Sequence, residues 1–191
     1  MPTLSPPLAP SLQLLSVNTG TARPLRAGGR TVLSAIGKSS VEGPVVVGRM
    51  GLARDEQADP GVHGGLDKAV YTYPVAHYPF WQAQRRERGV SLFDEVLPPG
   101  FMGENLGITE LLGHEVFVGD TLHFPDCVLR VTGPREPCSK FNAVMGFAQA
   151  GRVMAQAGCC GFYLAVETPG SITAGQTFTL VPGRRGLSIA Q

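Results

Sequence analysis

The chain has 191 residues, 43% of them hydrophobic, which is enough to bury the core of one large domain. Charged residues make up only 16% and the net charge is +1, so neither a general nucleic-acid binder nor a protein held electrostatically on a membrane is expected. The 25 glycines and 16 prolines predict many tight turns and short strands.

The four cysteines of the chain, Cys127, Cys138, Cys159 and Cys160, form no CxxC pair. A structural zinc site is therefore not expected. Four cysteines in a chain of this size do not indicate a disulfide framework either, which predicts a reducing compartment. Residues 1–15 contain no Lys or Arg and so lack the charged start of a signal peptide. Because no apolar run approaches the ~20 residues that span a bilayer, we expect a cytoplasmic protein without a membrane segment.

The first part of the chain is typical of short strands joined by turns. Residues 1–11 are expected to be a flexible lead-in, and strands are predicted over 12–17, 31–36 and 45–47, with turns between the first two. Lys38 lies in a polar turn after the second strand. Two interpretations stay open for it: an anion-facing cation at a strand end, or an ordinary solvated turn residue.

Residues 48–68 show little periodicity and end in a glycine-rich stretch that contains His63 and Lys68. Successive glycines allow backbone N–H groups to converge on a ligand, and these two side chains can add donors. The alternative is a plain turn leading into a strand over 69–73. The length of the segment is more informative than its glycines, because long segments without regular structure are usually functional or disordered.

Two helices are predicted next. Pro74 indicates the start of a helix over 75–88, and Ser91 caps a short helix that runs through Val96. In the loop that follows, Asn105 is either a donor to a polar ligand or a turn residue that bonds its own backbone.

Strands are then predicted over 116–118, 121–124 and 128–131, and the last of these leads into the stretch 133–142. The two prolines of this stretch prevent regular strand pairing, so we expect a stiff turn that presents Cys138.

Arg135 and Lys140 lie close to Cys138 in the sequence, which predicts a lowered pKa for the Cys138 thiol. The thiolate is the form that ligates metals or attacks electrophiles. A buried, inert thiol is the competing interpretation.

The last third predicts a helix over 147–157 and strands over 161–166 and 177–181, with a frayed end beyond. Together these elements predict a mainly β fold, a barrel or sandwich-like barrel with a few helical insertions. We expect one domain over 12–181 and a C-terminal tail over 182–191.

Several separated stretches, in this order, resemble the MOSC domain, named after the C-terminal domain of molybdenum cofactor sulfurase. The similarity is greatest to its stand-alone, bacterial YiiM-like branch. The matching stretches are Ser34–Lys38, Leu52–Trp81, Phe101–Leu106, Val118–Asp120 and Pro134–Asn142.

The resemblance implies a MOSC-type β-barrel that binds a molybdenum cofactor, a molybdopterin with one molybdenum ion. It assigns Cys138 as the metal ligand and catalytic residue, and thiolate suits this role as a soft, electron-rich ligand. The implied cofactor-binding residues are Lys38, His63, Gly64, Gly65, Asp67, Lys68, Asn105, Arg135, Lys140 and Asn142.

The activity implied by the resemblance is reduction of a small N-hydroxylated substrate, such as an N-hydroxylated purine. The chain has no iron–sulfur or flavin motif, so an external electron-donor protein is expected as a partner. Proteins of this branch also carry a C-terminal helical extension beyond the region matched here, which is expected to serve donor docking or substrate selection.

Three alternatives stay open. In the first, the chain is a non-catalytic cofactor or sulfur-carrier module with a persulfide on Cys138. In the second, it is a cysteine hydrolase or transferase, in which His63 is the base and Asp67 orients it. The third concerns assembly, since the exposed strands of a small barrel favour a homodimer.

Overall fold

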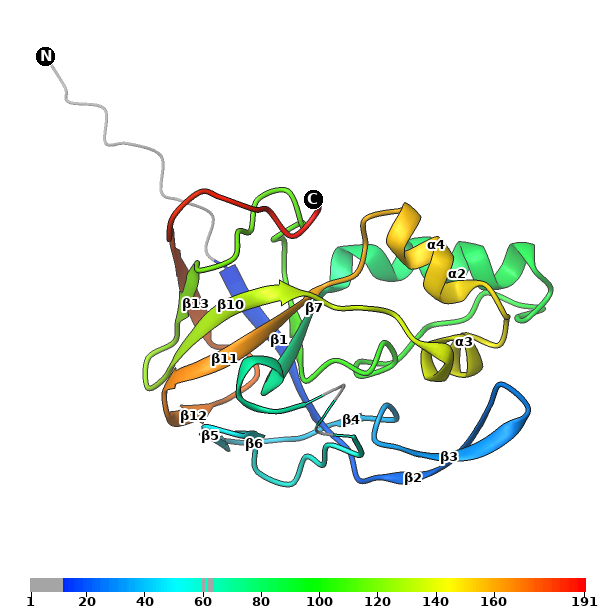
Figure 1. Ribbon diagram of the computed structural model, residues 1–191, viewed down its shortest axis with the longest axis horizontal. Coiled ribbons are helices and arrows are strands. Elements are labelled where there is room, and N and C mark those ends of the chain that lie inside the picture. The colour runs from blue at the N-terminus through cyan, green and yellow to red at the C-terminus, as the bar shows by residue number, and fades with distance from the viewer. Residues whose placement is uncertain (1–11, 60, 62–63) are drawn as a thin grey trace, which may run out of the picture.

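The computed structural model describes residues 12–59, 61 and 64–191, and its centre is a closed β-barrel (Figure 1). The barrel strands are β1 (Leu12–Thr19), β7 (Val70–Pro74), β8 (Leu106–Ile108), β9 (Thr121–His123), β10 (Val128–Pro134), β11 (Phe162–Thr168) and β13 (Thr177–Val181). They follow the order β13-β9-β10-β11-β7-β8-β1, and β1 closes the ring by pairing with β13. The β7–β8 pairing is parallel and the others are antiparallel. The predicted barrel is confirmed.

The remaining elements lie outside the barrel. The short strands are β2 (Arg23–Ala27), β3 (Arg30–Ser34), β4 (Ser39–Ser40), β5 (Val45–Gly48), β6 (Gly51–Leu52) and β12 (Gly170–Ile172). The helices are the 3-10 turns η1 (Leu66–Lys68) and η2 (Val75–His77), and the α-helices α2 (Tyr78–Glu87), α3 (Ser139–Met145) and α4 (Ala150–Gln156). The α-helices gather on one side of the barrel (Figure 1). No helix among the described residues is long and apolar enough to cross a membrane.

Strand alternation divides the apolar residues between two cores. Along β7, Val70 belongs to the core inside the barrel, whereas Tyr71 and Tyr73 belong to a second core outside it. The second core packs the outer barrel wall against the helices, through residues such as Trp81 of α2 and Phe141 of α3. Successive side chains of a strand point to opposite faces, so one strand serves both cores.

The stretch expected to be a stiff turn over 133–142 is shorter than predicted: residues 135–138 form an irregular connection that ends at Cys138, and it is flanked by the end of β10 and the start of α3. β10 continues to Pro134, which pairs with Phe162, and the next N–H, that of Arg135, donates to the carbonyl of Gly161 at 3.2 Å. A proline is tolerated there because β10 is ending and its missing donor is not needed. Helix α3 then begins at Ser139, directly after Cys138.

The short helix predicted from Ser91 through Val96 is wrong. Leu92, Phe93 and Val96 are all more than 80% exposed, so a helix here would have no apolar face to bury. The segment is held instead by an ion pair at 2.7 Å between Glu95 and Arg85 of α2.

One strand was not predicted, and one predicted strand is wrong. The predicted turn region before residue 31 contains strand β2, which pairs with β3. Residues 116–118 do not form a strand and make only an isolated bridge, from Phe117 to Ser188. In both cases, whether the segment forms a strand depends on a pairing partner elsewhere in the chain, which local composition does not reveal.

The expected frayed end is anchored. Ile189 is 7% exposed within the barrel core, and the N–H of Gly183 donates to Asp120 Oδ1 at 2.7 Å. Asp120 is fully buried, accepts the N–H of Phe117 at 3.0 Å, and pairs with Arg185 at 3.0 Å. One buried carboxylate therefore ties the C-terminal segment to the barrel.

Asp120→Ala is expected to lower the free energy of unfolding by about 2–4 kcal/mol, because it leaves buried N–H donors without an acceptor. Urea denaturation measures this. Asp126→Ala is the matched control: its carboxylate also accepts a backbone N–H, from Ser171, but at an exposed position, and it should cost less than about 1 kcal/mol. Equal losses in the two variants would contradict the anchoring role.

Candidate functional site

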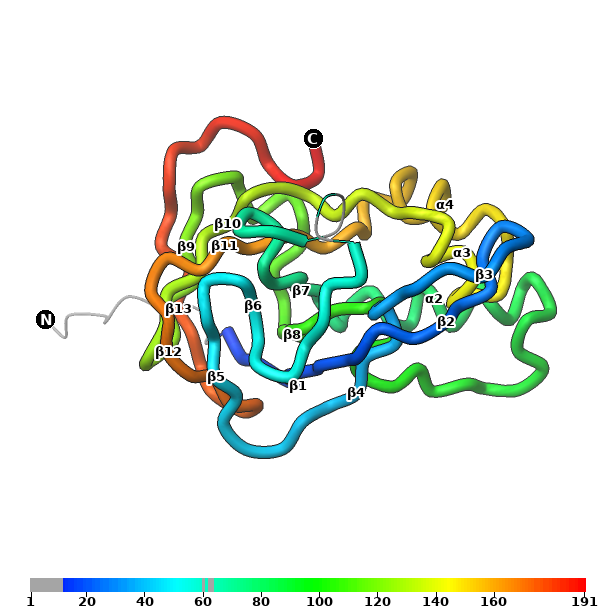
Figure 2. Tube along the Cα trace, turned by 60° about the horizontal axis from the view of Figure 1, so that its bottom comes forward, coloured from blue at the N-terminus to red at the C-terminus, as the bar shows by residue number. Residues whose placement is uncertain are grey.

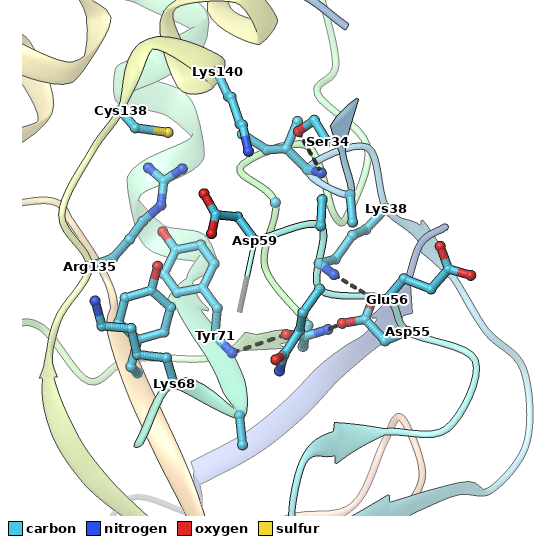
Figure 3. Close-up of a pocket in the computed structure, with 18 residues that line it drawn as sticks. Ser34, Lys38, Asp55, Glu56, Asp59, Lys68, Tyr71, Arg135, Cys138 and Lys140 are labelled. Carbon is cyan, nitrogen blue, oxygen red and sulfur yellow. Dashed lines mark hydrogen bonds and ion pairs between the residues drawn. The ribbon is translucent and has the colours of Figure 1, made fainter. Parts of the chain in front are cut away.

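A cleft opens between the outer wall of the barrel and the start of α3 (Figure 3). The space between its walls is about 630 Å³ with the open mouth included. The cavity itself is about 90 Å³, smaller than the ~300–1,000 Å³ of most ligand pockets, so a cofactor would lie partly in the open mouth. The predicted site residues that line the cleft are Lys38, Lys68, Asn105, Arg135, Cys138 and Lys140.

Cys138 is positioned by the end of β10 and the start of α3. It is the N-cap residue of α3, with extended backbone angles of φ −130° and ψ 176°, and its carbonyl accepts the N–H of Phe141 at 3.0 Å. Its half-buried side chain points into the cleft, as do those of Arg135 and Lys140 (Figure 3). Among the described residues that line the cleft, Cys138 alone carries a thiol.

Arg135 is a buried cation in the wall of the cleft. It is 6% exposed, and its guanidinium lies 4.7 Å from the ring centre of Phe141 and 5.2 Å from that of Tyr71. In the described part of the chain it forms no ion pair. A buried charge without a carboxylate partner is costly, so the position favours an anionic ligand.

Lys38 and Asn105 belong to a buried network centred on Asp55. Lys38 Nζ forms an ion pair with Asp55, and Asn105 Nδ2 donates to Asp55 Oδ2 at 2.8 Å. The same amide nitrogen donates to the carbonyl of Asn18 at 3.2 Å, and Asn105 Oδ1 accepts the N–H of Tyr71 at 3.0 Å. Both amide protons of Asn105 are thus used within the protein, which makes it a positioning residue rather than the expected donor to a ligand.

The other predicted residues lie outside the cleft lining or outside the described residues. The N–H of Gly65 donates to Gln57 Oε1 at 3.0 Å, and Gly64 does not line the cleft. The Asp67 side chain is 82% exposed and lies 3.9 Å from Arg130. Asn142 Oδ1 accepts the N–H of Gly151 at 2.7 Å, which joins α3 to α4. His63 lies outside the described residues.

Two tyrosines and an aspartate of the cleft were missed by the sequence interpretation. Tyr71 and Tyr163 lie with ring centres 5.5 Å apart, and Lys68 Nζ lies 5.5 Å from the ring centre of Tyr163. Burial raises the pKa of both phenols, which keeps them neutral. Asp59 directs its carboxylate into the same space (Figure 3). The available signal was alternation: Tyr71 lies on the strand face opposite Val70.

Glu104 supports the loop that carries Gly103 and Asn105 into the cleft. It is fully buried, and its Oε1 accepts the Tyr78 hydroxyl at 2.5 Å and the N–H of Gly100 at 2.6 Å. Oε2 has no hydrogen-bond partner among the described residues. Burial raises the pKa of Glu104 above 4.5, although the hydrogen bond from Tyr78 opposes this.

The raised pKa makes stability depend on pH. Above pH 4.5 the unfolded chain loses this proton before the folded protein does, so the contribution of Glu104 to stability falls until the pKa of the folded protein is passed. Each tenfold difference in proton affinity is worth about 1.4 kcal/mol. As the pH rises from 4.5 to the pKa of Glu104 in the folded protein, Glu104→Gln should therefore lose less free energy of unfolding than the wild type. Urea denaturation at a series of pH values measures this. Parallel pH profiles would contradict the prediction.

The family model for the MOSC domain matches residues 59–179, which is more than half of the chain. The chain belongs to the MOSC domain family. The matched range includes the cleft residues from Asp59 to Tyr163, and the family is associated with the molybdenum cofactor.

Relatives extend the match over most of this MOSC protein. It is 32% identical over 177 residues to the Bacillus subtilis protein named "Uncharacterized protein YflK", covering 92% of this chain and 76% of that one. It is 35% identical over 169 residues to a "Reductase" of Gibberella moniliformis, covering 88% of this chain and 29% of the fungal protein. The crystal structure of YiiM from Geobacillus stearothermophilus is similar, with 31% identity, a TM-score of 0.71, and coverage of 94% and 80%.

Proposed function

We propose that this protein is a molybdenum-cofactor-dependent reductase of N-hydroxylated compounds, such as N-hydroxylated purines. The observation that carries the proposal is the thiol of Cys138 in a cleft that it shares with the buried cation Arg135 and with Lys140. Membership of the MOSC family supports the cofactor, and the name of the fungal relative supports the reductive reaction.

The donor set of the cleft fits a molybdopterin. Cys138 Sγ is the proposed metal ligand, because thiolate is a soft ligand and metal binding requires its deprotonation. Arg135, Lys68 and Lys140 are the proposed partners of the anionic groups, in keeping with the preference of Arg and Lys for phosphate. Tyr71 and Tyr163 add ring faces to the wall. When bound, the cofactor would supply the two-electron redox chemistry of molybdenum.

The reaction balances as R–NHOH + 2 e⁻ + 2 H⁺ → R–NH₂ + H₂O, so the N–O bond breaks and the oxygen leaves as water. The protein's own residues bind and orient the reactants. The electrons come from an external carrier.

The test is purification from a host that synthesises the cofactor, with molybdenum measured by elemental analysis. We expect stoichiometric molybdenum, and conversion of an N-hydroxylated purine to the parent purine with reduced methyl viologen, followed by chromatography. Protein from a host that lacks cofactor synthesis is the control and should be inactive. A metal-free protein from the competent host, or a loaded protein that leaves the substrate unchanged, would overturn the proposal.

A further inference from the structure

The hairpin formed by β2 and β3 is a concentration of positive charge in a nearly neutral protein. Residues 20–38 contain Arg23, Arg26, Arg30 and Lys38 and no acidic residue, whereas the whole chain has a net charge of only +1. Lys38 is committed to the buried ion pair with Asp55. The other cations of this segment are exposed arginines.

These arginines are not neutralised by the protein. Within the described residues none of the three forms an ion pair, and Arg23 Nε makes only a 3.4 Å hydrogen bond to Thr21 Oγ1. Some exposed arginines elsewhere have a carboxylate partner, as in Arg86 with Asp94 at 2.8 Å, whereas others, such as Arg49 and Arg184, form no ion pair within the described residues. The three arginines therefore give the hairpin a positive potential, which attracts a negatively charged partner, although one carboxylate, that of Glu56, lies at its base, where Oε2 accepts the N–H of Ala22 at 2.7 Å.

The pairing register gives the hairpin an outward and an inward face. Arg26 is opposite Thr31, and their neighbours on the same face are Pro24 and Leu33, which is 55% exposed. All these residues are exposed, so the outward face combines one cation, Arg26, with a small apolar spot, whereas the pairing register places Arg23 and Arg30 on the other face, with their side chains still exposed. The inward face buries Ala27 and Ser34.

The hairpin lies beside the cleft. β2 contacts α3, and both views show the hairpin next to this helix (Figures 1 and 2). Ser34, at the end of β3, lines the cleft together with Cys138 and Lys140. A protein bound to the hairpin would thus be held at the rim of the proposed redox site.

We propose that the β2–β3 hairpin is the docking surface for a small acidic electron-carrier protein. The inference rests on the proposed function, because reduction of an N–OH group needs two electrons from outside the chain. A one-electron carrier delivers them in two encounters, each oxidising one reduced carrier, and the two protons come from solvent. Electron-transfer encounters use small interfaces steered by charge, which this cationic hairpin provides.

Binding tests the surface without reference to activity. The probe is an acidic [2Fe–2S] ferredoxin, titrated into the full chain by calorimetry at several salt concentrations. Arg26→Glu/Arg30→Glu should weaken binding about tenfold or more at low salt, since like charges then face each other. The control Arg49→Glu/Arg184→Glu makes the same change of charge at exposed positions that follow β5 and β13, strands at the opposite end of the molecule from the hairpin (Figure 2), and it should bind ferredoxin nearly as well as the wild type. If the Arg26→Glu/Arg30→Glu variant fails to fold, Arg26→Gln/Arg30→Gln replaces it, and its affinity for ferredoxin should lie between those of the wild type and the charge-reversed variant.

Turnover then separates the two proposals. With reduced methyl viologen, wild type and hairpin variants should be equally active, whereas with reduced ferredoxin the hairpin variants should be slower. If methyl viologen supports no turnover, the proposed reductase function fails, and ferredoxin binding still decides the docking surface. Equal binding by both charge-reversed pairs would overturn the docking proposal. The docking proposal would also be overturned if the protein bound an oligonucleotide more tightly than ferredoxin at the same salt concentration. The same holds if sedimentation showed a dimer that the hairpin substitutions dissociate.

Discussion

Cys138→Ala is expected to purify from a cofactor-producing host with little or no molybdenum and with no reductase activity. The thiol is the proposed protein ligand to the metal, and no other lining residue that the structure describes carries sulfur. Metal-ligand bonds cannot be replaced by the methyl group of alanine, so the loss should be large rather than graded. Elemental analysis and turnover with methyl viologen measure the two effects, and thermal unfolding confirms that the variant folds.

The matched control is Cys160→Ala, a second half-buried thiol that does not line the cleft. Burial raises the pKa of Cys160, although Arg135 opposes this, which makes it a poor source of thiolate. It should retain molybdenum and activity. Equal metal content in wild type and Cys138→Ala would contradict the ligand role. A removable mass of one sulfur atom on Cys138, found without metal, would favour the sulfur-carrier alternative instead.

The fold was more predictable than the site because strand patterns are local. The runs at 12–17, 69–73 and 177–181 alternate or are β-branched, and each one overlaps a barrel strand. The helix predicted from Ser91 failed for a non-local reason: the segment has no apolar surface to pack on and is anchored by Glu95 to Arg85. Local capping signals cannot reveal the absence of a packing partner.

The site shows the same limit more strongly. Cys138, Arg135 and Lys140 are adjacent in sequence, so their meeting in one cleft could be predicted. The role of Asn105 could not be predicted, because both of its amide protons are donated to acceptors that lie 50 and 87 positions away in the sequence. The sequence predicts only a strand around Tyr163, and the place of this side chain in the cleft depends on the pairing of β11 with β7. Long-range pairing decides which polar residues remain available to a ligand.

Asp55→Ala is expected to be the most destabilising substitution around the cleft. Asp55 and Lys38 have side chains that are only 6% and 7% exposed, and Asp55 also accepts the N–H of Gly20 at 2.9 Å. Removing the carboxylate leaves a buried ammonium and two further donors without an acceptor, which costs about 3–5 kcal/mol. Domains of this kind are stable by about 5–15 kcal/mol, so urea denaturation should show a large shift of the midpoint.

The double variant Lys38→Met/Asp55→Leu should recover part of this loss, because it removes the unpaired ammonium, whereas Asn105 Nδ2 and the N–H of Gly20 still lack their acceptor. The difference between the double variant and the sum of Lys38→Met and Asp55→Leu measures their coupling. Additive losses would show that the pair contributes little and that the network is held by Asn105 instead. A large coupling would show that the ion pair sets the cleft wall, because Asn105 links Asp55 to the N–H of Tyr71.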